Sequence, residues 1–206
     1  MTIGHAHSNH LKHDPTRGFG VFESYLAKKR ASIAESKIPI DARKGRVLDI
    51  GCGAFPFFLV NTNFNEKYGV DSIVHKKDFG KSIVLKSLDI EKEKLPFKNN
   101  YFDTVVMLAV FEHVRDEKLN TLLKEVRRVL KNEGLFIMTT PASWSVSVLW
   151  ALSRIGLVSK IEIDNHKNFN PPSKIRKILE DAGFEPHKIK SGYFEFYLNT
   201  YFVAKK

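Results

Sequence analysis

The chain has 206 residues, of which 43% are hydrophobic and 27% are charged, and this composition is typical of one globular domain. A single cysteine, Cys52, excludes an internal disulfide framework and a zinc site built from several cysteines, and it fits a reducing compartment. The net charge of +10 is spread from Lys12 to Lys206, which favours a solvated basic surface over a stripe that binds nucleic acid.

The N-terminal segment, residues 1–16, is polar and holds four of the eight histidines, His5, His7, His10 and His13. No cluster of carboxylates or cysteines surrounds them, so we expect a His-rich arm and no metal. The segment lacks the apolar core of a signal peptide, and the chain has no apolar run of about 18 residues or more. The expected location is therefore cytoplasmic.

Residues 17–206 are predicted to form a single domain in which strands and helices alternate. A helix is expected over residues 18–36, ended by Pro39, and strands are expected over 46–50, 66–72, 82–90, 102–110 and 134–141. Between the last two strands, an apolar stripe with helical spacing consists of Leu119, Leu122, Leu123, Val126, Val129 and Leu130. A helix begun by Pro171 and Pro172 and ended by Gly183 precedes two β-rich runs, 186–194 and 195–204, predicted to form a hairpin on the sheet edge. The alternation favours an α/β fold, with a parallel sheet and helices on both faces.

The first predicted strand ends in a loop, Asp49-Ile50-Gly51-Cys52-Gly53, that marks a ligand site at the carboxyl end of the sheet. A dinucleotide fits poorly, because Pro56 takes the place of the third glycine and the acid would repel a pyrophosphate. The same acid suits the cationic amino acid part of S-adenosylmethionine. Asp71 ends the second strand, where a carboxylate can accept hydrogen bonds from ribose hydroxyls, and Asp89 could accept one from the adenine amino group.

Four motifs follow one another in the chain: VLDIGCG at 47–53, YGVD at 68–71, LDIEKEKLPFKNNYFDTVVMLAVFEHV at 88–114 and LLKEVRRVLKNEGLFIMTTP at 122–141. In this order they resemble the class I S-adenosylmethionine-dependent methyltransferase superfamily, in particular its type 11 members. Residues 164–184 resemble the region after the fifth strand, so the similarity covers most of the chain. One departure is Phe55, which stands where the family pattern often has a last glycine.

The resemblance implies a Rossmann-like fold with a mostly parallel seven-stranded sheet and a C-terminal antiparallel hairpin. It implies S-adenosylmethionine as the cofactor and S-adenosylhomocysteine as the product. By the same resemblance, the methionine end is surrounded by Asp49, Gly51, Cys52 and Gly53, the ribose by Asp71 and Ser72, the adenine by Asp89 and Ile90, and the sulfonium side by the backbone near Ala109. Asp89 could equally cap the turn that follows it, and Asp103 is expected to be structural.

Methyl transfer needs an acceptor atom held in line with an already electrophilic methyl group in a dry site. A hydroxyl acceptor also needs a base, and the end of the fourth strand offers Glu112 and His113, although a histidine there is often structural. His166 is a further candidate for the acceptor pocket. An insertion over about 142–168 resembles a lid, and its apolar stretch 144–162 could cover a bulky acceptor, touch a membrane surface, or pack as an ordinary helix or dimer contact.

The sequence therefore predicts an S-adenosylmethionine-dependent methyltransferase (EC 2.1.1.-) that acts on a small-molecule acceptor, and a bulky or apolar acceptor is one reading of the insertion. A non-catalytic cofactor-binding or scaffold protein is the alternative that Phe55 raises, and a dinucleotide-dependent reductase is a third. Methylation of RNA or DNA is disfavoured. The box NPPS at 170–173 opens a helix after the fifth strand, whereas base-methylating enzymes carry such a box at the end of the fourth.

Overall fold

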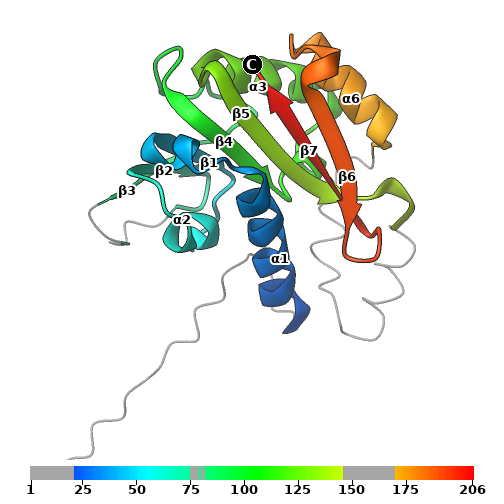
Figure 1. The fold of residues 1–206 in the computed structure, drawn as a ribbon, viewed down its shortest axis with the longest axis horizontal. Helices are drawn as coiled ribbons and strands as arrows, with labels where there is room; N and C mark the ends of the chain where they lie inside the picture. The colour runs from blue at the N-terminus through cyan, green and yellow to red at the C-terminus, as the bar shows by residue number, and fades with distance from the viewer. Residues whose placement is uncertain (1–20, 75–78, 80–81, 146–169) are drawn as a thin grey trace, which may run out of the picture.

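The structure, a computed structural model, describes residues 21–74, 79, 82–145 and 170–206 (Figure 1). Its centre is a seven-stranded sheet in the order β3-β2-β1-β4-β5-β7-β6. The strands are β1 (Arg46–Ile50), β2 (Glu66–Asp71), β3 (Ile83–Ser87), β4 (Phe102–Leu108), β5 (Leu130–Pro141), β6 (Ile189–Phe194) and β7 (Asn199–Lys205). Only β7 runs antiparallel to its neighbours. The predicted mostly parallel sheet with a C-terminal hairpin is confirmed.

Helices cover both faces of this sheet. The helices α1 (Val21–Lys37) and α2 (Phe57–Asn61) lie on one face, and α3 (Asp116–Val129) and α6 (Pro172–Asp181) lie on the other (Figure 1). Short 3-10 helices are η1 (Asp41–Lys44), η2 (Phe111–His113), η3 (Ser143–Ser145) and η4 (Pro186–Lys188). None of the helices in the described part of the chain combines the length and apolarity that a membrane crossing requires.

Two apolar cores follow from the alternation of side chains along the strands. Val47 and Val106 pack under α1 and α2, whereas Leu48 and Val105 pack under α3 and α6. The predicted stripe on α3 is buried at Leu119, Leu122, Leu123, Val126 and Val129. Each such side chain contributes about 1.5–3 kcal/mol relative to its exposed state, so this stripe fixes α3 to the sheet.

The ends of several elements differ from the sequence prediction. Leu130, the last residue of the predicted stripe, belongs to β5, where it pairs with Phe102 before the register shifts to Thr104 and Leu135. Between these pairs Glu133 has a positive φ of 65°, so a bulge rather than a helical turn joins α3 to the strand. Strand β4 ends at Leu108 rather than at residue 110, because Ala109 has a φ of 54° and leaves the extended conformation.

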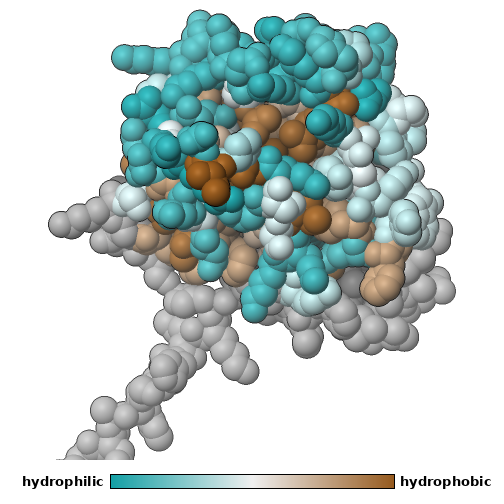
Figure 2. Space-filling view, in the orientation of Figure 1, coloured by the Kyte–Doolittle hydropathy of each residue, from teal (hydrophilic) through white to brown (hydrophobic). Residues whose placement is uncertain are grey.

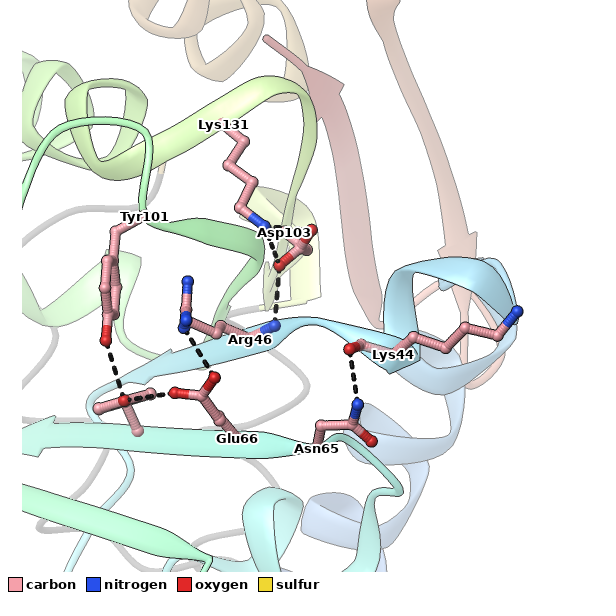
Figure 3. A network of polar contacts seen from close by, with 8 residues as sticks. Lys44, Arg46, Asn65, Glu66, Tyr101, Asp103 and Lys131 are labelled. Atoms are coloured by element: carbon pink, nitrogen blue, oxygen red, sulfur yellow. Dashed lines mark hydrogen bonds and ion pairs between the residues drawn. The ribbon is translucent and has the colours of Figure 1, made fainter.

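The amino end of the sheet is joined by a network of polar contacts centred on Asp103 (Figure 3). Its carboxylate accepts a hydrogen bond from the Arg46 amide at 2.8 Å and pairs with Lys131 Nζ, also at 2.8 Å. Arg46 in turn donates from Nε to Glu66 Oε1 at 2.9 Å. These contacts join β1, β2, β4 and β5, in agreement with the structural role expected for Asp103.

We expect Asp103→Ala to lower the free energy of unfolding by about 1–3 kcal/mol, because the Arg46 amide and the Lys131 ammonium lose their partner. Urea denaturation measures this change. The matched control is Asp41→Ala, which removes an exposed pair with Lys44 and should cost about 0.5 kcal/mol or less. Equal losses in the two variants would contradict the role given to Asp103.

Candidate functional site

The glycine loop after β1 is bent back toward the end of β2. The Gly51 amide donates to the Val70 carbonyl at 2.8 Å, and the Cys52 amide donates to the same oxygen at 3.3 Å. Gly51 and Gly53 have φ values of 76° and 72°, in the left-handed region that glycine adopts without strain. The loop therefore lies over the carboxyl ends of β1 and β2, as the sequence predicted.

The two glycines serve different purposes. A Cβ on Gly51 would lie 2.2 Å from Val110 Cγ2, so packing against the segment after β4 requires glycine there. A Cβ on Gly53 would meet nothing closer than the Phe55 carbonyl oxygen at 3.8 Å, so that side of the loop is open to a ligand. The Phe55 ring packs edge-on against Phe79, with ring centroids 5.6 Å apart. Phe55 therefore joins the loops after β1 and β2, and the open side of Gly53 remains.

Asp71 connects these two loops through its buried carboxylate, which is 4% exposed. Oδ2 accepts a hydrogen bond from the Gly53 amide at 3.0 Å, and Oδ1 accepts one from the Ile73 amide at 3.0 Å. The Ser72 hydroxyl donates to Oδ1 at 3.4 Å. Asp71 and Ser72 thus lie where the sequence placed them, beside Gly53, while contact with a ribose stays a prediction.

Asp49 brings a second buried carboxyl group to the same place. Burial first, and then the negative charge of Asp71, raise the pKa of Asp49 well above its usual value. Burial also raises the pKa of the Cys52 thiol, with smaller contributions from the charges of Asp49 and Asp71. The thiol therefore stays protonated and is no nucleophile. A cationic ligand group would stabilise the two carboxylates at this loop.

The predicted adenine residues follow β3 at the same edge. The Leu88 amide donates to the Asp71 carbonyl at 3.1 Å, which brings this segment against β2. Asp89 Oδ1 accepts the Glu91 amide at 3.0 Å and Oδ2 pairs with Lys92 Nζ at 2.8 Å, so its side chain caps the turn that follows. Ile90 packs half-buried against the core. The structure shows the capping role, and an adenine contact of Asp89 or Ile90 stays a prediction.

The segment after β4 holds the other predicted site residues. The Ala109 amide donates to the carbonyl and the hydroxyl of Thr139, at 3.0 and 3.2 Å, which holds its backbone in the left-handed conformation. Glu112 is 2% exposed, and its Oε2 accepts no hydrogen bond from any described residue. Its neighbour His113 is half-buried. Because Val110 packs on Gly51, this segment lies beside the glycine loop.

Two further connections at this edge escaped the sequence analysis. Asp116 Oδ1 accepts a hydrogen bond from Asn170 Nδ2 at 3.1 Å, and Oδ2 pairs with Lys174 Nζ at 2.6 Å, so the start of α3 is joined to the start of α6. The Arg115 amide donates to Glu91 Oε1 at 2.7 Å. Hydrogen bonds from Lys174 and Asn170 lower the pKa of Asp116. The NPPS box opens α6 as expected and places Asn170 in the interior, but nothing in the sequence indicated its partner.

Of the three catalytic candidates, Glu112 and His113 lie in η2, which follows Val110, the residue that packs on Gly51. Their catalytic roles stay a prediction. His166 lies outside the described residues, and so do residues 1–16 and most of the predicted insertion over about 142–168. The part of the insertion that is described, up to Ser145, forms η3.

Comparison with known proteins supports the family resemblance that the motifs indicated. Residues 48–138 match the family model described as "Methyltransferase domain", which confirms the resemblance that the four motifs indicated. An uncharacterized protein of Methanocaldococcus jannaschii is 32% identical over 148 residues, which make up 72% of this chain and 58% of that protein. The chain thus spans less than two thirds of the length of this relative.

Solved structures share the fold at low sequence identity. An S-adenosylmethionine-dependent methyltransferase from Archaeoglobus fulgidus matches with a TM-score of 0.66 and 20% identity, over 88% of this chain and 94% of that one. Phosphoethanolamine N-methyltransferase 2 of Haemonchus contortus, solved in complex with S-adenosyl-L-methionine, matches with a TM-score of 0.61 and 17% identity, over 87% of this chain and 52% of that one. These likenesses confirm the Rossmann-like methyltransferase fold.

We expect Asp49→Asn to raise the free energy of unfolding at pH 7 by about 1–3 kcal/mol, because it removes a carboxyl group that burial keeps from ionising easily. The pKa of Asp49 is higher in the folded state than in the unfolded state. The wild type therefore loses stability as the pH rises from the unfolded pKa toward the folded pKa, and it loses none below the unfolded pKa. The difference between variant and wild type should therefore vanish below about pH 4. Urea denaturation from pH 3 to pH 8 measures it, and equal stability at pH 7 would contradict the proposed cost of Asp49.

Proposed function

We propose that this chain, which carries a class I S-adenosylmethionine-dependent methyltransferase domain, transfers a methyl group to a small-molecule acceptor in the cytoplasm. The observation that carries the proposal is the pair of buried carboxylates, Asp49 and Asp71, at an open glycine loop. S-adenosylmethionine has an ammonium group and a sulfonium group and no phosphate, so it suits an acidic loop. When bound, this cofactor would supply an electrophilic methyl group.

The residues of the chain divide the work of holding this cofactor. Gly53, whose outer side is open, allows the backbone to approach the methionine end, and Asp49 places a carboxyl group there whose ionisation a cationic ligand group would favour. Asp71 is positioned by the Gly53 and Ile73 amides, so its carboxylate is oriented before any ligand binds. Pre-oriented hydrogen-bond acceptors of this kind would receive the two ribose hydroxyls.

Transfer to a hydroxyl acceptor requires a group that takes up its proton. We assign this role to His113, because the half-buried imidazole follows β4 beside the glycine loop and can pass the proton on to water. Glu112 is almost fully buried, which suits a residue that positions the acceptor or the segment rather than one that exchanges protons with solvent. An N–H or O–H donor on a ligand would satisfy its Oε2.

A small molecule fits this site better than a nucleic acid. The carboxylates Asp49 and Asp71 would repel a phosphate backbone at the loop itself, and the basic side chains of the chain are scattered rather than gathered in a stripe. A membrane surface stays a candidate partner.

The cofactor assignment is tested by calorimetric titration with S-adenosylhomocysteine. We expect micromolar binding by the wild type and a loss of about 10–100-fold in affinity for Asp71→Ala, from the loss of charge-assisted hydrogen bonds. Asp71→Asn keeps an acceptor oxygen and should lose less. Asp181→Ala, at the far end of α6, is the matched control and should bind as the wild type does. Binding of NADH instead of S-adenosylhomocysteine would contradict the proposal.

The assignment of His113 is tested with methyl-labelled S-adenosylmethionine and a panel of hydroxyl and amine acceptors. For a hydroxyl acceptor that the panel identifies, we expect His113→Gln to lower kcat by about 10²–10⁴-fold while the affinity for S-adenosylhomocysteine is unchanged. An unchanged kcat would show that His113 is structural, as a histidine in this position often is.

A further inference from the structure

The turn between β6 and β7 displays two aromatic side chains in an unusual backbone conformation. Glu195, Phe196 and Tyr197 follow one another with φ values of 51°, 53° and 67°. Phe196 is 93% exposed and Tyr197 is 67% exposed. Left-handed conformations are unfavourable for bulky residues, and turns that require them normally use glycine or asparagine.

The surrounding structure holds this turn in place. The Leu198 amide donates to the Glu195 carbonyl at 3.0 Å, and Asn199 Nδ2 donates to Glu195 Oε2 at 2.6 Å. The Ala142 amide donates to the Leu198 carbonyl at 2.8 Å and so ties the turn to the end of β5. A strained conformation that is fixed from several sides at the surface points to a use for the side chains that it displays.

Other aromatic side chains extend this surface. The rings of Tyr193 and Tyr197 are 5.5 Å apart, and Trp144 lies two residues after Ala142, in η3. All of them are about half exposed or more. We call this surface the aromatic edge, and its members are Trp144, Tyr193, Phe196 and Tyr197.

Basic side chains of α1 border the aromatic edge. Glu195 is within electrostatic reach of Arg30 and Lys29, although burial is the larger effect and raises the pKa of Glu195. Lys29 Nζ also lies 5.3 Å from the ring centre of Tyr25, another half-exposed aromatic residue. The aromatic edge therefore has positive charge beside it, in a chain whose net charge is +10.

The aromatic edge lies at the same end of the sheet as the glycine loop. Because β6 runs parallel to β5 and β4, its end at Phe194 is a carboxyl end, three strand spacings or roughly 14 Å from β4. In Figure 1 the turn lies at the lower right of the sheet, and in Figure 2 apolar colour protrudes at that place.

We propose that the aromatic edge inserts into the headgroup region of an anionic lipid bilayer. Tryptophan and tyrosine combine an apolar ring with a polar tip and concentrate at bilayer interfaces. The side chain of Phe196 has no polar atom, so its transfer out of water carries no cost of desolvating a polar group. The neighbouring lysine and arginine side chains add attraction to anionic lipid. Single-stranded RNA fits less well, since the rings of Tyr193 and Tyr197 are inclined by 50° to each other and Glu195 stands among them.

Docking in this way would bring the bilayer to the edge of the sheet at which the acceptor enters. This consequence rests on the proposed function, whereas the docking itself does not. It gives the acceptor a chemical class, a compound with a lipid-like apolar part that is taken from the membrane.

The docking is tested by co-sedimentation of the full chain with vesicles of equal parts phosphatidylglycerol and phosphatidylcholine. We expect the wild type to bind these vesicles and to bind pure phosphatidylcholine more weakly. The double variant Phe196→Asn/Tyr197→Gly should lower the partition coefficient at least about tenfold, because two aromatic side chains no longer enter the bilayer. Asparagine and glycine adopt positive φ easily, so the variant should fold, and Trp144→Ser, which leaves the turn intact, should weaken binding in the same direction.

The matched control is Ile40→Asn, which removes an apolar side chain that is 79% exposed at the opposite end of the sheet and should bind as the wild type does. Absence of vesicle binding by the wild type, or equal binding by the double variant, would overturn the proposal. A third outcome would also overturn it: the wild type binds a single-stranded RNA, the double variant does not, and neither protein binds vesicles. Titration of the double variant with S-adenosylhomocysteine distinguishes failure of the membrane docking from failure of the proposed function, because the variant should bind this compound as tightly as the wild type does.

Discussion

The register between β1 and β2 is the constraint on which the candidate site depends. Ile50 pairs with Val70, so the two strands end level, the Gly51 amide reaches the Val70 carbonyl, and the Asp71 carboxylate reaches the Gly53 amide. A shift by one residue would turn Asp71 to the other face of the sheet. The opposite end of the same pair is fixed by Arg46 and Glu66, which pair in register and form an ion pair at 2.9 Å. The network at the amino end therefore determines the geometry at the carboxyl end.

Two buried carboxyl groups meet at one loop. Asp71 connects the loops after β1 and β2 through the Gly53 and Ile73 amides, whereas burial raises the cost of ionising Asp49. Asp49 and Asp71 are each 4% exposed, and the charge of Asp71 adds to the effect of burial in raising the pKa of Asp49. The carboxylates of Asp103 and Asp116, by contrast with Asp49, each pair with a lysine. Asp103 receives a lysine and a backbone amide, and Asp116 receives a lysine and an asparagine. A cationic ligand group at this loop would favour the ionised form of Asp49 and so offset the cost of burying its carboxyl group.

The sequence predicted the parts of the molecule that depend on local pattern. Strand β1 was predicted with its observed bounds, the buried face of α3 from its leucine and valine spacing, and the glycine loop from its motif. Two contacts join residues far apart in the chain, Arg115 with Glu91 at a separation of 24 positions and Asp116 with Asn170 at 54. Patterns in a single sequence carry no information on such pairs. Leu130 was assigned to the helix because it continues the apolar stripe, but pairing with Phe102 decided its conformation.

The positions with left-handed backbone show why local prediction fails where it does. At the amino end of the sheet such positions hold Asn100 and Glu133, a polar pair suited to exposed turns, and Glu133 is stabilised there by Lys205 and Lys188. At the carboxyl end Glu195 also has this conformation, and its carboxylate accepts a hydrogen bond from Asn199. Ala109, Phe196 and Tyr197 share the conformation there, and their side chains offer the backbone no hydrogen bond in return. Turn chemistry would select glycine or asparagine at these three positions. Since the conformations persist at residues that do not favour them, we attribute them to the features that they position. These are a bend beside the glycine loop and an aromatic edge at the same end of the sheet.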